Sequence, residues 1–182
     1  MEVEILTTCV KEFTADWNEN YYAAGTAVVG NITVRRFPVR RRDTAAFDRV
    51  NRKLMDGKQI SPKEEQIFVE EMVNSPQLYE YMRDTADEYG LFVFIPYMFG
   101  TTYYGMQVCP EKSVLIPCFH DEAYVYMRLF RQAYVKARGM IYNAMPEMEL
   151  ANRVYDFTTT EQICMGLSLI HISEPTRHSL IS

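Results

Sequence analysis

Short apolar segments alternate with longer segments of helical periodicity along most of the chain, and this alternation is the feature that most constrains the fold. Alternating strands and helices are typical of a mainly parallel sheet flanked by helices. The strands predicted after residue 90 are continuously apolar and bounded by helix breakers, as strands covered on both faces are. We therefore predict an α/β fold with a Rossmann-like, mainly parallel sheet. The predicted strands are Val3–Thr8, Ile32–Val39, Leu91–Pro96, Val114–Cys118 and Met140–Asn143.

Capping residues mark where several of the intervening helices begin. Asp43 precedes a segment with apolar residues at helical spacing, and Ser61-Pro62-Lys63-Glu64 has the arrangement of a capping box. Ser75-Pro76 repeats the serine–proline start, because proline is well tolerated in the first helical turn. The predicted helices are Thr44–Leu54, one that begins at Ser61, Ser75–Tyr89, Glu122–Ala137 and one that begins at Pro146.

Composition and charge limit the classes of protein to which the chain can belong. Its 182 residues are 48% hydrophobic and 24% charged, which is ordinary for a globular protein with one core. The net charge of −5 disfavours nucleic acid as a partner. The four cysteines have no C-x-x-C spacing and are typical of reduced thiols, and no apolar run approaches the length of about 18 residues that crosses a membrane. We therefore expect a cytoplasmic protein without a metal site.

The stretch Val114–Phe130, VLIPCFHDEAYVYMRLF, places polar residues directly after a buried strand. His120-Asp121-Glu122 lies between the carboxyl end of that strand and the start of the next predicted helix. Ligands of parallel sheets bind at the edge where the strands have their carboxyl ends. We predict that His120, which can donate or accept a hydrogen bond near neutral pH, lines a site there. The alternatives are that Asp121 or Glu122 caps the helix and that His120 only satisfies a carbonyl.

Several motifs occur in a fixed order along the chain. They are Leu6-Thr7-Thr8, the pair Trp17 and Tyr21 in the spacing Trp-x-x-x-Tyr, Arg35-Arg36-Phe37-Pro38, and Ile116-Pro117 followed by His120-Asp121-Glu122. In this order they resemble the N-terminal domain of glycosyltransferase family 4, the retaining group with the two-domain GT-B fold. The resemblance covers residues 2 to about 166, and it is carried by the order of the motifs more than by any one of them. Residues 1–166 would form a partial N-terminal Rossmann-like domain.

The resemblance implies a site and a reaction. A sugar would pass from a nucleotide-sugar donor to a hydroxyl of a sugar or lipid-linked acceptor, with retention and without a metal or other cofactor. His120 would lie at the cleft floor as the catalytic, positioning and polarising group. Alternatively, Trp17 and Tyr21 pack their own loop, and Asn143 and Glu147 are strand-end and helix-start signals. The other residues expected to line the cleft are Thr7, Thr8, Trp17, Asn18, Tyr21, Tyr97, Thr101, Asp121, Asn143 and Glu147.

The resemblance also implies parts that this sequence lacks. A strand, a glycine-rich loop and a helix would precede Val3, and that strand would lie between Val3–Thr8 and Leu91–Pro96, so both of these strands are expected to have an unpaired edge. A second domain with paired glutamates for the nucleotide-sugar would follow Cys164-Met165-Gly166. We therefore expect a transferase fragment that is inactive alone. The alternative is a non-enzymatic Rossmann-like binding or regulatory module.

The segment VRRFPVRRR concentrates positive charge in Arg35, Arg36 and Arg40–Arg42. One interpretation is a peripheral contact of Arg40, Arg41 and Arg42 with a membrane surface or an anionic, lipid-linked acceptor. The alternative is a solvated strand end and loop whose arginines pair with Asp43 and Asp48.

The glycines of Gly100-Thr101-Thr102-Tyr103-Tyr104-Gly105 have the spacing of a phosphate-binding loop. The lysine and the hydroxyl residue that follow in such a loop are missing, so nucleotide binding there is not expected.

The segment Leu167–Ser182 does not continue the pattern before it. Codons that can encode Leu167–Arg177 spell an adaptor of transposon-based sequencing libraries, read as though it were coding. We therefore expect residues 167–182 to be a non-native tail, with the natural sequence departing from this one near Gly166, and we assign no function to His171 or His178.

Overall fold

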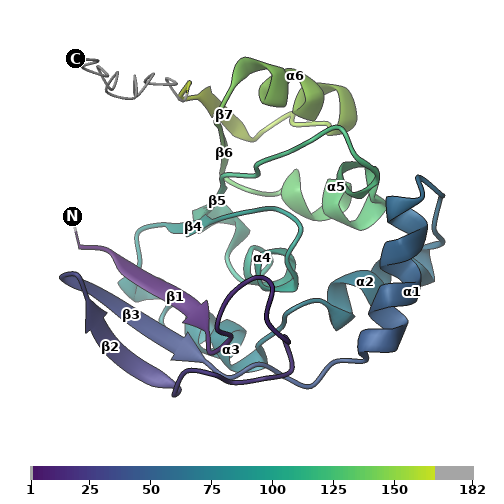
Figure 1. Ribbon diagram of the computed structural model, residues 1–182. Coiled ribbons are helices and arrows are strands. Elements are labelled where there is room, and N and C mark those ends of the chain that lie inside the picture. The colour runs from purple at the N-terminus through teal and green to yellow at the C-terminus, as the bar shows by residue number, and fades with distance from the viewer. Residues whose placement is uncertain (1, 167–182) are drawn as a thin grey trace, which may run out of the picture.

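The strands of the protein form two sheets rather than one (Figure 1). The computed structural model describes residues 2–166, so the predicted tail lies outside the described residues. The strands are β1 (Glu4–Thr8), β2 (Gly25–Val29), β3 (Ile32–Phe37), β4 (Phe92–Phe94), β5 (Ser113–Leu115), β6 (Gly139–Tyr142) and β7 (Glu161–Cys164). The α-helices are α1 (Thr44–Met55), α2 (Pro62–Glu71), α3 (Pro76–Asp84), α4 (Gly100–Gly105), α5 (Arg128–Tyr134) and α6 (Met145–Val154). Short 3₁₀ turns cover Ala86–Glu88, Pro110–Lys112 and Ala123–Tyr126.

The larger sheet is entirely parallel, with the order β4-β5-β6-β7, and helices flank it. This confirms the predicted α/β, Rossmann-like fold. The smaller sheet has the order β1-β3-β2, with β1 parallel to β3. β1 and β4 are therefore both edge strands, as expected for a sheet without a strand between them.

The hairpin of β2 and β3 was not anticipated from the sequence. β2 pairs antiparallel with β3, and Val29 lies opposite Ile32. Gly30 and Asn31, the two residues between the strands, have φ angles of 56° and 69°. Positive φ at both turn positions matches the twist of a two-residue hairpin, and glycine and asparagine adopt it most readily. A Gly-Asn pair between two apolar runs was the sequence signal for this turn.

The predicted helix starts are largely confirmed. The Asp43 side chain accepts a hydrogen bond from the backbone N–H of Ala46, and Ser61 and Glu64 form both halves of the capping box. Ser75 does not cap α3, because its hydroxyl donates instead to the carbonyl of Pro38 at 2.7 Å. α3 also ends at Asp84 rather than near Tyr89, where a 3₁₀ turn continues the chain.

The long helix predicted over Glu122–Ala137 is wrong. The chain forms a 3₁₀ turn, then an extended residue at Met127, and only then α5. Neither Asp121 nor Glu122 supplies a cap. The buried Glu65 of α2 does so instead, because its carboxylate accepts the N–H groups of Arg128 at 2.8 Å and Leu129 at 3.0 Å. A carboxylate at a helix N-terminus satisfies N–H groups that have no partner within the helix.

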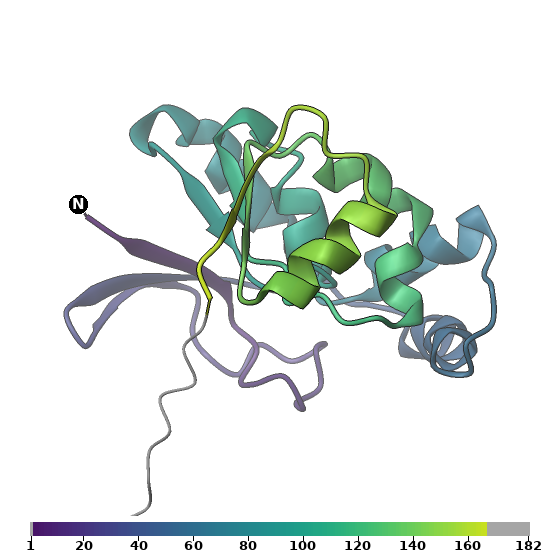
Figure 2. The same ribbon diagram turned by 90° about the horizontal axis from the view of Figure 1, so that it is seen from above.

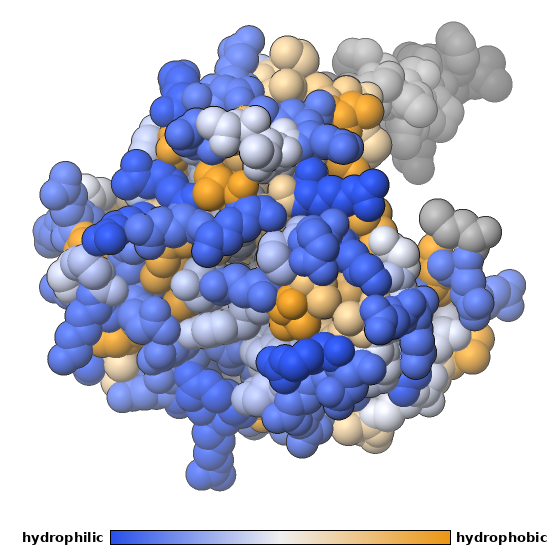
Figure 3. Space-filling view, turned by 180° about the vertical axis from the view of Figure 1, so that it is seen from behind, coloured by the Kyte–Doolittle hydropathy of each residue, from blue (hydrophilic) through white to orange (hydrophobic). Residues whose placement is uncertain are grey.

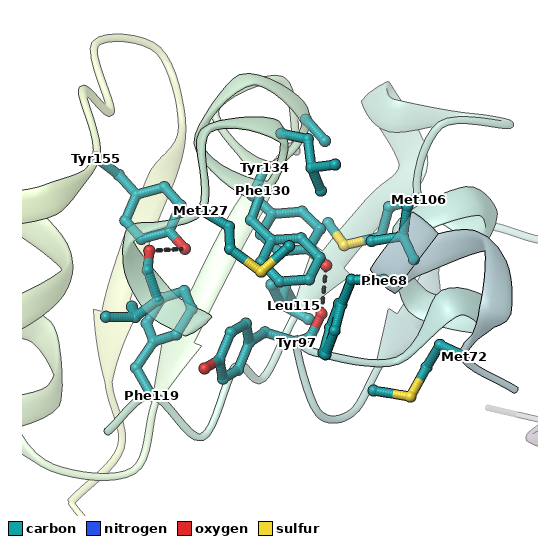
Figure 4. Packing of buried hydrophobic residues seen from close by; sticks show 14 of the residues in the cluster. Phe68, Met72, Tyr97, Met106, Leu115, Phe119, Met127, Phe130, Tyr134 and Tyr155 are labelled. Carbon is teal, nitrogen blue, oxygen red and sulfur yellow. Dashed lines mark hydrogen bonds between the residues drawn. The ribbon is translucent and has the colours of Figure 1, made fainter. Parts of the chain in front are cut away.

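The main core lies between the larger sheet and its helices (Figure 4). Phe68, Leu115, Phe130 and Tyr134 are fully buried there. The hydroxyl of Tyr134 donates to the carbonyl of Tyr97, and that of Tyr155 donates to the carbonyl of Val125 at 3.0 Å. Buried tyrosines need such partners, because an unsatisfied hydroxyl in an apolar core is destabilising. A second, smaller cluster on α3 joins both sheets and contains Phe37, Leu78, Met82, Phe92 and Cys109.

The glycine-rich segment forms helix α4 and packs tightly against its neighbours. A Cβ atom on Gly100 would lie 2.8 Å from the carbonyl oxygens of Val69 and Val73, and one on Gly105 would lie 2.6 Å from the Phe94 ring. Close packing therefore requires glycine at both positions. The segment whose glycine spacing resembles a phosphate-binding loop is a helix in the structure. No helix within residues 2–166 is long and apolar enough to cross a bilayer.

Candidate functional site

A hollow of about 360 Å³ lies at the carboxyl ends of β1 and β4. Thr7 and Thr8 end β1 on one side of it, and Thr101 in the first turn of α4 lies on the other. Trp17 comes from the loop after β1, so four of the predicted site residues meet here. The parallel topology explains this, because strands that run the same way bring their carboxyl ends to one edge.

Trp17 both packs its own loop and lines the hollow. Its indole ring lies 5.9 Å from the Phe13 ring and 6.2 Å from the Phe99 ring, between centroids. Its Nε1–H donates to the carbonyl of Phe13 at 2.9 Å. The Arg42 guanidinium lies over the indole ring, 4.7 Å from its centroid. The indole is therefore held in place, and one wall of the hollow is a fixed aromatic surface.

Arg42 is an unusual neighbour for that wall. Burial lowers the pKa of its guanidinium, although the carboxylates of Asp48, Asp16 and Glu71 counteract this. Its Nη1 donates to the carbonyl of Glu71 at 2.7 Å, while its Nε is buried with no hydrogen-bond partner. The guanidinium is held mainly by contact with aromatic faces, which favours a role in building the loop.

Asn18 and Tyr21 do not line the hollow. The Asn18 side chain accepts the N–H of Arg42 at 2.8 Å and donates to the Thr44 hydroxyl at 3.2 Å, so it fastens the loop to the start of α1. The Tyr21 ring is exposed and packs against Tyr22 at 4.9 Å between centroids. Neither residue contributes to the hollow, and their place in the cleft stays a prediction.

His120 lies at the carboxyl side of β5 with its side chain exposed, which agrees with the predicted position. It does not line the hollow between β1 and β4. The backbone around it is fixed, because its carbonyl accepts the N–H of Glu122 at 2.9 Å and the preceding Cys118 has a φ of 57°. Such a φ is rare for a residue with a side chain and is maintained by surrounding contacts. The catalytic role of His120 stays a prediction.

Glu147 is buried and holds two loops rather than lining a cleft. One carboxylate oxygen accepts the N–H of Phe119 at 2.8 Å, and the other accepts the N–H of Asn143 at 2.8 Å. These residues follow β5 and β6, so one carboxylate ties together the chain after two neighbouring strands. The Asn143 amide is half-buried and donates to the Cys118 sulfur at 3.5 Å. These contacts favour the alternative of a first-turn helix residue, and the cleft-lining role of Glu147 stays a prediction.

Tyr97 and Asp121 also lie outside the hollow. Tyr97 is fully buried, and its hydroxyl donates to Glu122 at 3.1 Å. Burial, together with the nearby Glu122 charge, raises the pKa of the Tyr97 phenol far above its ordinary value. Asp121 is exposed and accepts the Tyr126 hydroxyl at 2.7 Å and the Arg153 guanidinium at 3.3 Å. Tyr97 belongs to the core and Asp121 to the surface, so neither lines the hollow.

Sequence reasoning missed part of the lining. Lys11 and Glu12 bring opposite charges to the hollow, and Phe13 and Phe99 bring aromatic rings. The signal for the charged pair was its place directly after the end of β1, where a parallel sheet exposes its binding edge. Hydroxyl, charged and aromatic groups around one hollow suit a ligand that has both hydroxyl groups and apolar faces. Within residues 2–166, His, Cys, Asp and Glu side chains do not gather into a group of three that could hold a metal ion.

The arginines of the basic segment mostly contact the protein itself. Arg35 pairs with Glu4 at 3.0 Å, and Arg36 lies over the Tyr22 ring at 4.7 Å. Arg40 pairs with Glu71 at 3.4 Å, whereas Arg41 is exposed. None of these ion pairs is with the expected Asp43 or Asp48, although the Asp48 carboxylate acts on Arg42. The contacts favour the structural interpretation over a membrane contact, which stays a prediction.

Comparisons with known proteins leave the family open: no family model, no curated protein and no solved structure matches the chain.

Proposed function

We propose that this chain is the acceptor-binding part of a retaining glycosyltransferase that resembles family 4. The complete enzyme would transfer a sugar from a nucleotide-sugar to a hydroxyl of the acceptor. The observation that carries the proposal is the hollow at the carboxyl ends of β1 and β4, which Thr7, Thr8 and Thr101 line together with Trp17. A sugar presents hydroxyls at its rim and C–H groups on its faces, and this lining offers a partner for each.

The proposed chemistry is positioning more than covalent catalysis. Holding the acceptor hydroxyl near the transferred sugar supplies much of the acceleration in a reaction of this kind. Lys11 and Glu12 add charged hydrogen bonds, which are stronger than neutral ones and orient the acceptor. In this proposal, His120 polarises or orients a hydroxyl farther along the same rim, where its imidazole is exposed to solvent.

The proposal predicts sugar binding without sugar transfer by the purified chain. The glutamates that hold the nucleotide-sugar in the resembling family belong to a second domain, whose motifs do not occur in this sequence. Measurable transfer from a nucleotide-sugar by the 182-residue protein would contradict this part of the proposal.

Trp17 makes acceptor binding directly measurable. It is the single tryptophan of the chain, and it lines the hollow, so its fluorescence reports on a sugar that enters. We expect mono- and disaccharides to change the emission in a saturable way. Thr101→Val removes one hydroxyl at nearly constant size and should weaken binding about three- to tenfold, since one hydrogen bond contributes about 0.5–1.5 kcal/mol.

The matched control is Thr159→Val, on an exposed threonine that does not line the hollow. It should bind sugars like the parent protein. If no sugar changes the Trp17 emission, or if Thr101→Val and Thr159→Val bind equally well, the acceptor site is not in this hollow.

The second candidate is a non-enzymatic binding module. It is favoured by the position of His120, which lies outside the hollow. The two functions are distinguished in a longer gene product that includes a donor-binding domain. If His120→Ala in that protein abolishes transfer while its sugar affinity stays unchanged, the transferase is supported. If the unsubstituted longer protein binds sugar but transfers none, the binding module is supported.

A further inference from the structure

A second hollow, of about 560 Å³, lies between α5 and the chain that follows α6. One of its walls is α5, with Arg128, Arg131 and Gln132. The other wall contains Asp156 and Thr158, from the loop that leads into β7. This second hollow shares no lining residue with the hollow at the carboxyl ends of β1 and β4. It is therefore a separate candidate site.

The loop that forms this second wall is fixed beside the amino ends of β6 and β7. The hydroxyl of Thr160 donates to the carbonyl of Val135, which lines the second hollow, at 3.1 Å. The N–H of Glu161, the first residue of β7, donates to the carbonyl of Arg138, just before β6, at 3.0 Å. The loop lies on the far side of the molecule from the smaller sheet (Figure 2). The two hollows are therefore at opposite ends of the parallel strands.

The two arginines lie on one face of a helix whose start is held in place. Arg131 follows Arg128 by three residues and Gln132 follows it by four, and side chains at these spacings are neighbours on a helix surface. The Glu65 carboxylate accepts the backbone N–H of Arg128 at 2.8 Å, so the first turn of α5 is anchored to α2. The Cβ atoms of residues three or four apart are about 5–6 Å from each other. One anionic group can therefore take hydrogen bonds from both guanidinium groups.

Neither arginine has its charge neutralised by a carboxylate. Among residues 2–166, the ion pairs include Arg35 and Arg153 but neither Arg128 nor Arg131. Burial raises the pKa of the Tyr155 phenol, and the nearby positive charge of Arg131 opposes this rise. The guanidinium donors of both arginines are thus available to a ligand that enters the second hollow.

The rest of the lining is mostly polar. Asp156 adds one negative charge, and its ionised carboxylate can only accept hydrogen bonds, so it requires a donor on the ligand. The Thr158 hydroxyl and the Gln132 amide can each donate and accept. Val135 and Val154 provide an apolar contact. The face of the molecule seen from behind is mainly hydrophilic, with hydrophobic residues in small separate areas (Figure 3), which favours a polar ligand over an apolar protein surface.

We propose that the second hollow binds a small polyol phosphate, with the phosphate held by Arg128 and Arg131 and a hydroxyl donating to Asp156. The planar N–H groups of a guanidinium match the oxygens of a phosphate. Two guanidinium groups suit a phosphate ester, which carries a charge of about −1.5 to −2 at pH 7, better than a carboxylate with one charge. The volume of about 560 Å³ lies in the range of small-molecule sites, about 300–1,000 Å³.

The test measures binding of sorbitol 6-phosphate to the purified 182-residue protein by isothermal titration calorimetry at low salt. Arg128→Gln and Arg131→Gln each remove one charge from an exposed side chain, so both variants should fold. Each should weaken binding about tenfold or more, because hydrogen bonds from a charged group are strong. The matched control is Arg52→Gln, on an exposed arginine of α1 outside both hollows, which should bind within about twofold of the parent protein.

Three related compounds identify the groups that are recognised. Gluconate carries a carboxylate on a chain of the same length, sorbitol carries no charge, and inorganic phosphate has no hydroxyl-bearing chain. Each should bind the parent protein at least about tenfold more weakly than the phosphate ester, because each lacks one of the two recognised groups. Asp156→Ala should reduce the difference between the ester and inorganic phosphate, since it removes the acceptor for the polyol hydroxyl.

The proposal is overturned if the phosphate ester does not bind, or if both arginine variants bind it as tightly as Arg52→Gln does. Gluconate that binds as tightly as the ester would overturn the assignment to phosphate, and inorganic phosphate that does so would overturn the role of Asp156. Trp17 lines only the first hollow, so the ester should leave its emission unchanged, and Arg131→Gln should bind sugars like the parent protein. Failure here therefore leaves the proposed function intact.

Discussion

The two sheets contain strands of similar apolar character, yet they differ sharply in burial. β5, Ser113–Leu115, is buried throughout because helices cover the larger sheet, whereas β2, Gly25–Val29, is exposed throughout. Val28 is 72% exposed, although valine is as apolar as the buried Val114. An apolar strand is therefore stabilising only where another layer covers it, and the energetic centre of the molecule lies between the larger sheet and its helices.

The largest expected effect on stability comes from truncating one apolar side chain in each sheet to alanine. Leu115→Ala creates a cavity in the main core and should lower the free energy of unfolding by about 2–5 kcal/mol. Val28→Ala, on the exposed strand, should change it by no more than about 0.5 kcal/mol. Urea denaturation followed by circular dichroism measures both. Equal losses from the two variants would mean that the smaller sheet is buried in solution.

Two glycine-to-alanine substitutions test how tightly the helices over the larger sheet are packed. Gly100→Ala places a Cβ atom 2.8 Å from two backbone carbonyls and should destabilise the protein by about 1–3 kcal/mol, the usual cost of overpacking. Gly90→Ala has no atom within 4 Å of the new Cβ and should be neutral or slightly stabilising. Thermal unfolding of the pair compares them directly. A stabilised Gly100→Ala protein would show that α4 is loosely packed and that helix propensity dominates there.

The smallest effect concerns the partly exposed carboxylate of Glu64 in the first turn of α2. The hydrogen bond from Lys53, with further hydrogen bonds from Ser61, lowers the pKa of Glu64 to about 2 from its ordinary value of 4.5. Because this pKa is depressed in the folded state, the stabilisation is present above pH 4.5 and is lost as the pH falls towards 2. Lys53→Met should raise the pKa of Glu64, measured by carbon NMR of its carboxyl group.

The matched control is Lys63→Met, a nearby lysine with no hydrogen bond to Glu64 among the described contacts. It should leave the Glu64 titration unchanged. A Glu64 pKa that stays low in Lys53→Met would assign the shift to the Ser61 capping box instead.

Much of the fold was predictable because its signals are local. Asp43 and the Ser61 capping box predict where their helices begin, and the apolar strands after residue 90 predict a parallel sheet. The break at Met127 was not predictable, because α5 takes its cap from Glu65, far away in the sequence. A contact of this kind exists only once the chain has folded.

The candidate site also contains residues that the sequence could place and residues that it could not. Thr7, Thr8 and Thr101 could be placed at one sheet edge from topology alone, because parallel strands end together. Tyr97 and Glu147 follow strands just as closely, but their side chains turn into the protein and bind Glu122 and two backbone N–H groups. Sequence gives the position of a residue along a strand, whereas the direction of its side chain depends on the packing around it.

The carboxylate of Glu147 has a mechanical consequence. Its two oxygens hold the chain after β5 and the chain after β6, and Glu147 itself belongs to the first turn of α6. A displacement of α6 would therefore be transmitted to both segments at once. The backbone of Phe119, directly before His120, and that of Asn143 are thus both tied to one side chain of α6, a helix to which neither belongs.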